Sequence, residues 1–191
     1  MNRFVLRAQR ARALADRLPH AREALLLFAN VSEHQALGAG GEAFRALAPQ
    51  APDAWLERIE AEMRPVVGPP PDRGDNECPA CGELPQLGIL RQQGDGDALH
   101  LACSVCRSEW PFPRTNCPAC GDAEHLEFYR SEHLAHLQTL VCTGCKTYLH
   151  IVDLKKELGC VPEADEIAAQ ALDAWALEQG YQKLTPNLVG V

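Results

Sequence analysis

The sequence Cys-Pro-Ala-Cys-Gly occurs at residues 78–82 and again at residues 117–121. A second Cys-x-x-Cys pair follows in each copy, separated from the first pair by 21 residues, and the second copy repeats the first at a constant offset of 39 residues. A fixed period of this kind indicates an internal duplication. Residues 78–116 and 117–155 are therefore predicted to be two copies of one structural module.

The spacing of the cysteines is typical of metal ligands. Two intervening residues let one tight turn present both sulfurs to a single ion, which adjacent cysteines cannot do. Pro79 and Pro118 fix φ for that turn, while Gly82 and Gly121 permit the positive φ that directs backbone N–H groups toward the sulfurs. Twenty-one residues between pairs are enough for a β-hairpin that returns the second pair to the first. We expect two metal ions, one held by Cys78, Cys81, Cys103 and Cys106 and the other by Cys117, Cys120, Cys142 and Cys145.

Three other uses of these cysteines fit the sequence less well. Disulfides require an oxidising compartment, and the chain opens with arginines rather than with the apolar run of a secretion signal. Thiol redox catalysis usually employs one Cys-x-x-Cys at a helix N-terminus, whereas four such pairs occur here at ribbon spacing. A third alternative joins Cys103 and Cys106 to Cys117 and Cys120, which would break the repeat.

The sequence between and after the cysteine pairs favours strands. Gly-Asp-Gly-Asp at residues 94–97 predicts a hairpin turn in the first copy, and Thr147 to Val152 is predicted to be the third strand of the second copy. The matching stretch of the first copy, residues 108–113, is interrupted by prolines. We therefore expect an α+β fold that contains two tandem three-stranded modules of the zinc-ribbon type.

Residues 1–65 are predicted to form a helical subdomain. Apolar residues recur there at helical spacing, and proline or glycine ends each segment. Asp53 is expected to cap the fourth helix with its carboxylate. The four predicted helices cover residues 3–18, about 21–37, 42–48 and 53 to about 64.

Two further segments complete the chain. A Pro-rich linker is predicted at residues 66–77, because three consecutive prolines disfavour both helix and sheet. Residues 156–191 are predicted to form a C-terminal helix and tail, with the helix beginning at Pro162 and ending at Gly180. Cys160 has no partner at metal-ligand spacing and is interpreted as a small buried thiol. Eight cysteines complete two sites, so no ligand role is expected for the histidines of the repeat, His100, His125, His133, His136 and His150.

Charge and motifs argue against several function classes. The formal net charge is -8, and eight thiolates with two divalent ions would change it by -8 and +4, to -12. Nucleic-acid affinity depends on cationic contacts, so no nucleic-acid partner is expected. No stretch of 18 apolar residues could cross a bilayer, so no membrane insertion is expected. Catalytic motifs are missing and four protein ligands leave no open coordination position, so the protein is not expected to be an enzyme.

The flanks of the cysteine pairs carry a family resemblance. Cys-Pro-Ala-Cys-Gly is followed by Cys-Ser-Val-Cys-Arg-Ser-Glu-Trp at 103–110, by the second Cys-Pro-Ala-Cys-Gly and by Cys-Thr-Gly-Cys-Lys-Thr-Tyr-Leu at 142–149. With a closing helix that reaches Tyr181, this order resembles the formate dehydrogenase accessory (maturation) protein family over roughly residues 78–188. The resemblance implies a cytoplasmic bacterial protein that contacts the catalytic subunit of formate dehydrogenase and holds iron at the eight cysteines in rubredoxin-like sites. Zinc is the alternative metal, because four thiolates suit both ions.

The sequence departs from the family pattern in two respects. Only 77 residues precede the first cysteine, fewer than family members usually have. Arg107 and Lys146 also follow the second pair of each copy, where a rubredoxin turn favours glycine.

The leading prediction is an accessory or assembly factor for the maturation of formate dehydrogenase, which binds the catalytic subunit through a scaffold made rigid by metal. A rubredoxin-like module for electron or metal transfer is the first alternative. A nucleic-acid-binding zinc ribbon is the second, and the acidic charge disfavours it.

Overall fold

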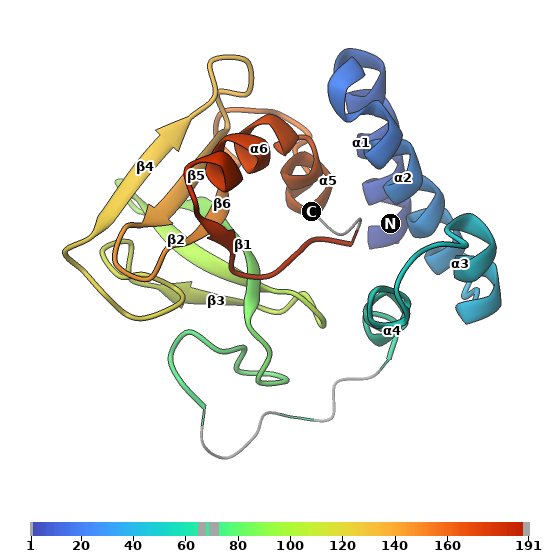
Figure 1. Cartoon of the computed structure of the whole chain (residues 1–191), viewed down its shortest axis with the longest axis horizontal. Helices are drawn as coiled ribbons and strands as arrows, with labels where there is room; N and C mark the ends of the chain where they lie inside the picture. Colours follow the sequence, from blue (N-terminus) through green and yellow to red (C-terminus); the bar gives the residue numbers. More distant parts are fainter. Residues whose placement is uncertain (1, 65–67, 69–72, 189–191) are drawn as a thin grey trace.

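The computed structural model of the chain describes residues 2–64, 68 and 73–188. Helices α1 to α4 lie on one side of the molecule, the strands of a seven-stranded sheet lie on the other, and helices α5 and α6 lie between them (Figure 1). The predicted α+β fold is confirmed. The predicted linker, residues 66–77, lies outside the described residues at 66–67 and 69–72.

The helical subdomain has the four predicted helices, α1 (Arg3–Arg17), α2 (Arg22–Ala36), α3 (Gly41–Leu47) and α4 (Asp53–Ala61). The side chain of Asn2 caps α1 by accepting a hydrogen bond from the N–H of Phe4 at 3.0 Å. Pro19 ends α1 and opens a short 3₁₀ turn, η1 (Pro19–Ala21), that leads into α2. The predicted cap of α4 is wrong. Pro52 occupies the N-cap position, and the carboxylate of Asp53 pairs instead with Arg45 of α3.

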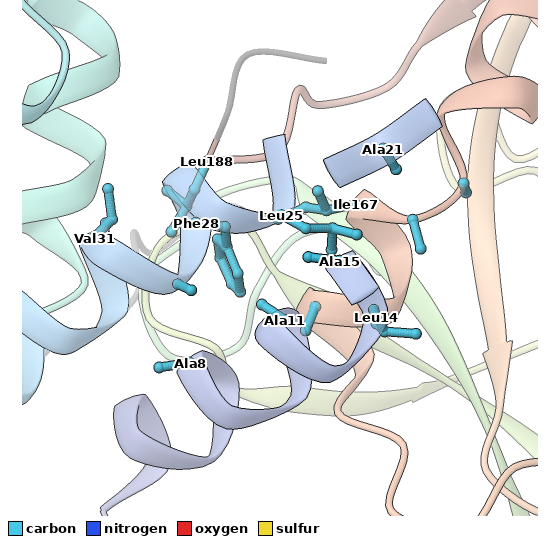
Figure 2. Packing of buried hydrophobic residues seen from close by; sticks show 14 of the residues in the cluster. Ala8, Ala11, Leu14, Ala15, Ala21, Leu25, Phe28, Val31, Ile167 and Leu188 are labelled. Carbon is cyan, nitrogen blue, oxygen red and sulfur yellow. The ribbon is translucent and has the colours of Figure 1, made fainter. Parts of the chain in front are cut away.

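The helices and the sheet share one apolar core. Figure 2 shows Ala11 and Leu14 of α1 packed toward Leu25 and Phe28 of α2, with Ile167 of α5 beside them. Leu137 and Val152 from the sheet and Leu188 from the tail belong to the same buried cluster. The alanines of α1 allow the close approach of α2, since a small side chain keeps the two backbones near each other.

Each copy of the repeat forms three antiparallel strands, as predicted. The first copy contains β1 (Pro85–Gln93), β2 (Gly96–Cys103) and β3 (Glu109–Phe112). The second copy contains β4 (Leu126–Arg130), β5 (Leu137–Cys142) and β6 (Thr147–Asp153). In both copies the central strand is the one that ends at the first cysteine of the second pair.

The two copies join into one sheet with the order β3-β2-β1-β6-β5-β4. The junction is a parallel pairing of β1 with β6, in which Gly88 lies opposite Ile151. A Cβ atom at residue 88 would come within 2.9 Å of the side chains of Ile151 and Leu99, so a larger residue there would force these side chains to shift. Leu99 and Leu101 of the first copy and Leu140 and Leu149 of the second then form one buried cluster. Neither small module has to build a core alone.

The segment after the repeat differs from the single helix predicted. It is divided into α5 (Pro162–Ile167) and α6 (Gln170–Glu178) by a turn at Ala168 and Ala169, where ψ is -13° and 14°. After Gly180, which has a φ of 80°, strand β7 (Gln182–Lys183) pairs in parallel with β6. The tail then returns to the helical subdomain, where the carbonyl of Pro186 accepts a hydrogen bond from Arg58 at 2.6 Å.

Candidate metal centres

The eight cysteines of the repeat gather in two groups. Group 1 contains Cys78, Cys81, Cys103 and Cys106, and group 2 contains Cys117, Cys120, Cys142 and Cys145. Within each group all four sulfurs lie within 4.8 Å of one another. The grouping follows the repeat, and the alternative that joins the second pair of one copy to the first pair of the next is wrong. All nine cysteines are free thiols, so none of them forms a disulfide.

The sulfur separations suit a tetrahedral site. Sulfurs held about 2.3 Å from one ion lie roughly 3.8 Å apart. In group 1 the sulfur of Cys81 lies 3.4 Å from that of Cys103 and 3.5 Å from that of Cys106. In group 2 the sulfur of Cys117 lies 3.7 Å from that of Cys145, and the sulfur of Cys120 lies 3.9 Å from that of Cys142. Both groups are able to hold a metal ion without rearrangement of the backbone.

Backbone N–H groups point at the sulfurs. The N–H of Ala80 donates to the sulfur of Cys78 at 3.3 Å, and the N–H of Ala119 donates to the sulfur of Cys117 at 3.4 Å. Val105 donates in the same way to Cys103 at 3.3 Å. Such donors offset the negative charge of thiolates, so the turns are prepared for the ligand form of cysteine.

The turns reach this geometry through left-handed residues. Gly82 and Gly121 have φ values of 82° and 77°, as the sequence predicts. Arg107 and Lys146 occupy the corresponding place after the second pairs, and their φ values are 63° and 61°. A non-glycine residue in this region costs about 1 kcal/mol or more in strain. The positions expected for glycine thus keep the glycine conformation, with a cationic side chain added.

Two hydroxyl groups that the sequence reasoning missed complete the turns. Ser108 lies 3.2 Å from the sulfur of Cys106, and Thr147 lies 2.9 Å from the sulfur of Cys145. Burial raises the pKa of Cys106, but hydrogen bonding by Ser108 outweighs burial and lowers the pKa to about 7. The pKa of Cys145 is lowered to about 7 in the same way by Thr147. The 39-residue offset relates Ser108 to Thr147 and would have identified both.

The two groups differ in their exposure. In each group the first cysteine of each pair is buried. Cys81 and Cys106 of group 1 are half-buried, whereas Cys120 of group 2 is exposed. Cys120 also lines a hollow of about 310 Å³ together with Asn76 and Phe112. Group 2 is therefore the more accessible of the two.

Group 1 is tied to the helical subdomain. The Arg107 side chain, only 5% exposed, pairs with the carboxylate of Glu62, which comes directly after α4. Its guanidinium also donates to the side-chain oxygen of Gln86 at 2.6 Å. Arg7 of α1 donates to the same Glu62 carboxylate at 2.9 Å. The equivalent Lys146 of group 2 is exposed and lies over the ring of Tyr181 at 5.4 Å.

Two histidines of the repeat are buried away from the cysteine groups. His136 lies 2.9 Å from Asp165, and His150 lies 2.7 Å from Asp173. Among the described residues, both groups of four consist of cysteine alone, so the histidines add no ligand to them. These two residues instead connect the sheet to α5 and α6.

Cys160 lies near one of these pairs. Its sulfur, a nitrogen of His136 and an oxygen of Asp165 lie within 4.8 Å of one another. The Oδ2 atom of Asp165 already accepts hydrogen bonds from Arg10 at 2.9 Å and from the N–H of Val161 at 2.8 Å, and its Oδ1 atom accepts one from Arg10 at 3.2 Å. Its oxygens are thus occupied by protein donors, and we interpret the cluster as a buried ion-pair network that holds α5 on α1.

Among the described residues, no helix is both long enough and apolar enough to span a bilayer.

Comparison with known families confirms the resemblance drawn from the cysteine motifs. Residues 77–114 match the family model "FdhE, central domain", and residues 115–189 match "FdhE, C-terminal domain". The boundary between the two matches lies just before Cys117, where the second copy of the repeat begins.

Curated relatives match over the same part of the chain. "Protein FdhE homolog" of Aquifex aeolicus (strain VF5) is 37% identical over 118 residues, which are 60% of this chain and 42% of the relative. "Protein FdhE homolog" of Pseudomonas putida is 34% identical over 143 residues, which are 71% of this chain and 43% of the relative. The matched region thus spans less than half the length of these relatives.

The fold also has a counterpart among solved structures. The crystal structure of the FdhE protein from Pseudomonas aeruginosa aligns with a TM-score of 0.70 and 22% sequence identity, covering 100% of this chain and 97% of that one. At this identity the likeness concerns the fold alone. The sequence matches, which cover residues 77–189 without a gap, carry the assignment: the chain belongs to the FdhE family.

Proposed function

We propose that this protein is an accessory factor in the maturation of formate dehydrogenase, that it contacts the catalytic subunit of that enzyme, and that each four-cysteine group holds one metal ion. Membership of the FdhE family supports the role, and the two groups of converging sulfurs support the metal sites. The role is not catalytic. Four thiolates around one ion leave no open position for a substrate.

The metal would act on the scaffold. An ion bound by four thiolates joins two turns that are separated in sequence, and its binding free energy becomes folding free energy of the module. In this protein the stabilised modules also carry the surface on which the helices pack, since Arg107 directly follows a cysteine of group 1 and reaches Glu62. Iron is the ion that the family resemblance implies, and zinc is the alternative for the same donor set.

The sites require reduced thiols, which supports a location in the cytoplasm. The sulfurs are separate and the turns are shaped for ligation rather than for a disulfide. A reducing compartment preserves that state.

A pull-down with metal analysis tests the proposal. The tagged protein is expressed with the catalytic subunit of formate dehydrogenase, recovered anaerobically and analysed for iron and zinc. We expect the subunit to be recovered with about two equivalents of metal per chain, one for each group. Recovery of the metal-loaded protein without the subunit would contradict the proposal that the catalytic subunit is the partner. Recovery of both proteins without metal would contradict the role of the cysteines.

The exposure of Cys120 favours one additional candidate function, electron or metal transfer through group 2. A ferric ion in four thiolates gives a red protein, whereas zinc gives a colourless one. A colourless, zinc-only protein from iron-replete anaerobic cells would exclude electron transfer.

A further inference from the structure

Strand β4 forms one edge of the sheet and has no strand beyond it among the described residues. Its residues Glu127 to Arg130 are all exposed. The other edge, β3, has only four residues, with Pro111 inside it and Pro113 directly after it. Prolines protect an edge because they donate no hydrogen bond. Strand β4 contains no proline or glycine, and its register with β5 has no bulge. Neither proline nor a bulge protects this edge.

The backbone of β4 offers hydrogen-bonding groups to the outside. The N–H of Thr143 donates to the carbonyl of His125 at 2.9 Å, so these residues form a directly bonded pair of the β4–β5 ladder. Bonded and non-bonded pairs alternate along an antiparallel ladder. The N–H and C=O groups of Leu126, Phe128 and Arg130 therefore point away from β5, toward the position of an added strand.

Large side chains accompany this edge. Phe128 is 46% exposed and lies opposite Leu140, a member of the buried cluster shared by the two copies. An added strand would cover Phe128 and extend that cluster. On the opposite face of β4, the ring of Tyr129 packs against that of Trp175 of α6 at a tilt of 45°, with ring centroids 4.3 Å apart. This contact fixes the strand from the helical side.

The surroundings of β4 are acidic. Residues 121–133 contain four acids, Asp122, Glu124, Glu127 and Glu132, and one arginine, Arg130, so their formal charge is -3. Four thiolates and a divalent ion in group 2 would add -2, and the exposed Lys146 next to Cys145 would offset one of these charges. Group 2 is adjacent, since Leu126 lies opposite Cys142. A segment with arginine or lysine side chains fits this charge, and an acidic segment or a nucleic acid does not.

We propose that β4 receives an extended, basic segment of the partner protein as an additional strand beside group 2. Addition of a peptide strand to an exposed sheet edge is a general mode of recognition, in which backbone hydrogen bonds give affinity and side chains give specificity. The inference rests on the proposed function, and it specifies which part of this chain meets the client and what the client must present.

Peptide binding to the metal-loaded full chain tests the inference. The probe is a fluorescent seven-residue peptide in which arginine alternates with valine, and the controls are the same peptide with glutamate for arginine and an arginine peptide with alternate backbone nitrogens methylated. Fluorescence anisotropy gives the affinities. We expect the basic peptide to bind, and each control to bind at least about tenfold more weakly, because each lacks either the charges or the backbone donors.

Two variants at one position separate the backbone from the side chain. Phe128→Pro removes the outward N–H, and Phe128→Thr removes the ring but keeps the N–H. We expect the proline variant to bind the basic peptide about tenfold more weakly than the threonine variant. Metal content and circular dichroism establish that both are folded. If the proline variant does not fold, the double variant Glu124→Lys with Glu132→Lys is tested in its place. Its affinity for the basic peptide is expected to be about tenfold lower than that of the parent protein.

Several results would overturn the inference. These are absence of binding by the basic peptide, equal binding of the basic and acidic peptides, and equal binding by the proline and threonine variants. A protein dimer that Phe128→Pro abolishes, without any peptide binding, would assign the edge to a second copy of the chain. The pull-down separates this inference from the proposed function. If the proline variant recovers the catalytic subunit as well as the parent protein does, only the inference about β4 fails.

Discussion

Arg107 and Glu62 form an ion pair that is almost completely closed to solvent, with side-chain exposures of 5% and 0%. Arg107 follows the last cysteine of group 1, and Glu62 follows α4, 45 residues earlier in the chain. Arg7 of α1 and Gln35 of α2 bond the same carboxylate at 2.9 and 3.0 Å. Three helices thus meet one cysteine turn through a single acid. This arrangement makes group 1 part of the contact between the sheet and helices α1, α2 and α4.

Arg107→Gly and Lys146→Gly form a matched pair of variants, because the 39-residue repeat places the two residues at equivalent positions. Each variant replaces a strained left-handed residue by glycine, and this relief of strain should raise the free energy of unfolding by roughly 1 kcal/mol. Arg107→Gly also breaks a buried ion pair, at a cost of about 3 kcal/mol or more. We expect it to be clearly destabilised, and Lys146→Gly to remain within about 1 kcal/mol of the parent. Urea unfolding of the metal-loaded proteins measures the stability of both variants. Equal losses of stability would refute the proposed difference between the Arg107 and Lys146 turns.

Cys78→Ser and Cys117→Ser remove equivalent ligands from groups 1 and 2 and give a second prediction. Each variant is expected to lose about one equivalent of metal. Loss at group 1 should also increase hydrogen exchange in α4 and at the end of α2, since Arg107 is then no longer held by an ordered turn. Loss at group 2 should leave exchange in those helices unchanged. If α4 and the end of α2 were equally protected from hydrogen exchange in both variants, group 1 would not support these helices.

The repeat explains why much of this fold follows from sequence. A constant 39-residue offset defines the modules, their three strands and the grouping of the cysteines. Gly82 and Gly121 adopt the positive φ that the turn requires. The helices of the first 64 residues also follow their apolar spacing.

The relations between segments do not follow from the repeat. The parallel pairing of β1 with β6 places the Ile151 side chain against Gly88, and no local pattern marks that glycine as a contact point. The pairing of Asp53 with Arg45 depends on how α3 meets α4 and overrides a good capping residue. The break at Ala168 and Ala169 lies in a run of good helix formers, so tertiary packing decides it rather than propensity. Long-range contacts thus account for most of the differences between the fold expected from the sequence and the structure.

The exposure of Cys120 predicts unequal release of the two ions. A colorimetric chelator should remove about one equivalent quickly from the accessible group 2 and the other slowly from group 1, whose thiols are all buried or half-buried. Absorbance of the metal–chelator complex follows the release. The variant Cys117→Ser should lack the fast phase and Cys78→Ser the slow one. A single phase in the parent protein, or loss of the slow phase in Cys117→Ser, would contradict this order.

The buried Glu62 carboxylate predicts a pH dependence of stability. Burial raises its pKa, but Arg107 and Arg7 outweigh burial and lower the pKa from 4.5 to about 2. A carboxyl group whose pKa is lower in the folded state stabilises the fold fully above pH 4.5, and this contribution is lost as the pH falls toward 2. The shift corresponds to about 3 kcal/mol.

The glutamine of Glu62→Gln cannot ionise, so this variant should be less stable than the parent at pH 7. The difference in the free energy of unfolding should shrink between pH 4.5 and 2. Urea unfolding at each pH gives the difference, and metal content is recorded alongside because acid also protonates the thiolates. Glu33→Gln is the control, since the Arg12–Glu33 pair is 44% and 47% exposed and should contribute little. A difference between parent and Glu62→Gln that stays constant down to pH 3 would show that the buried acid is not held ionised by its two arginines.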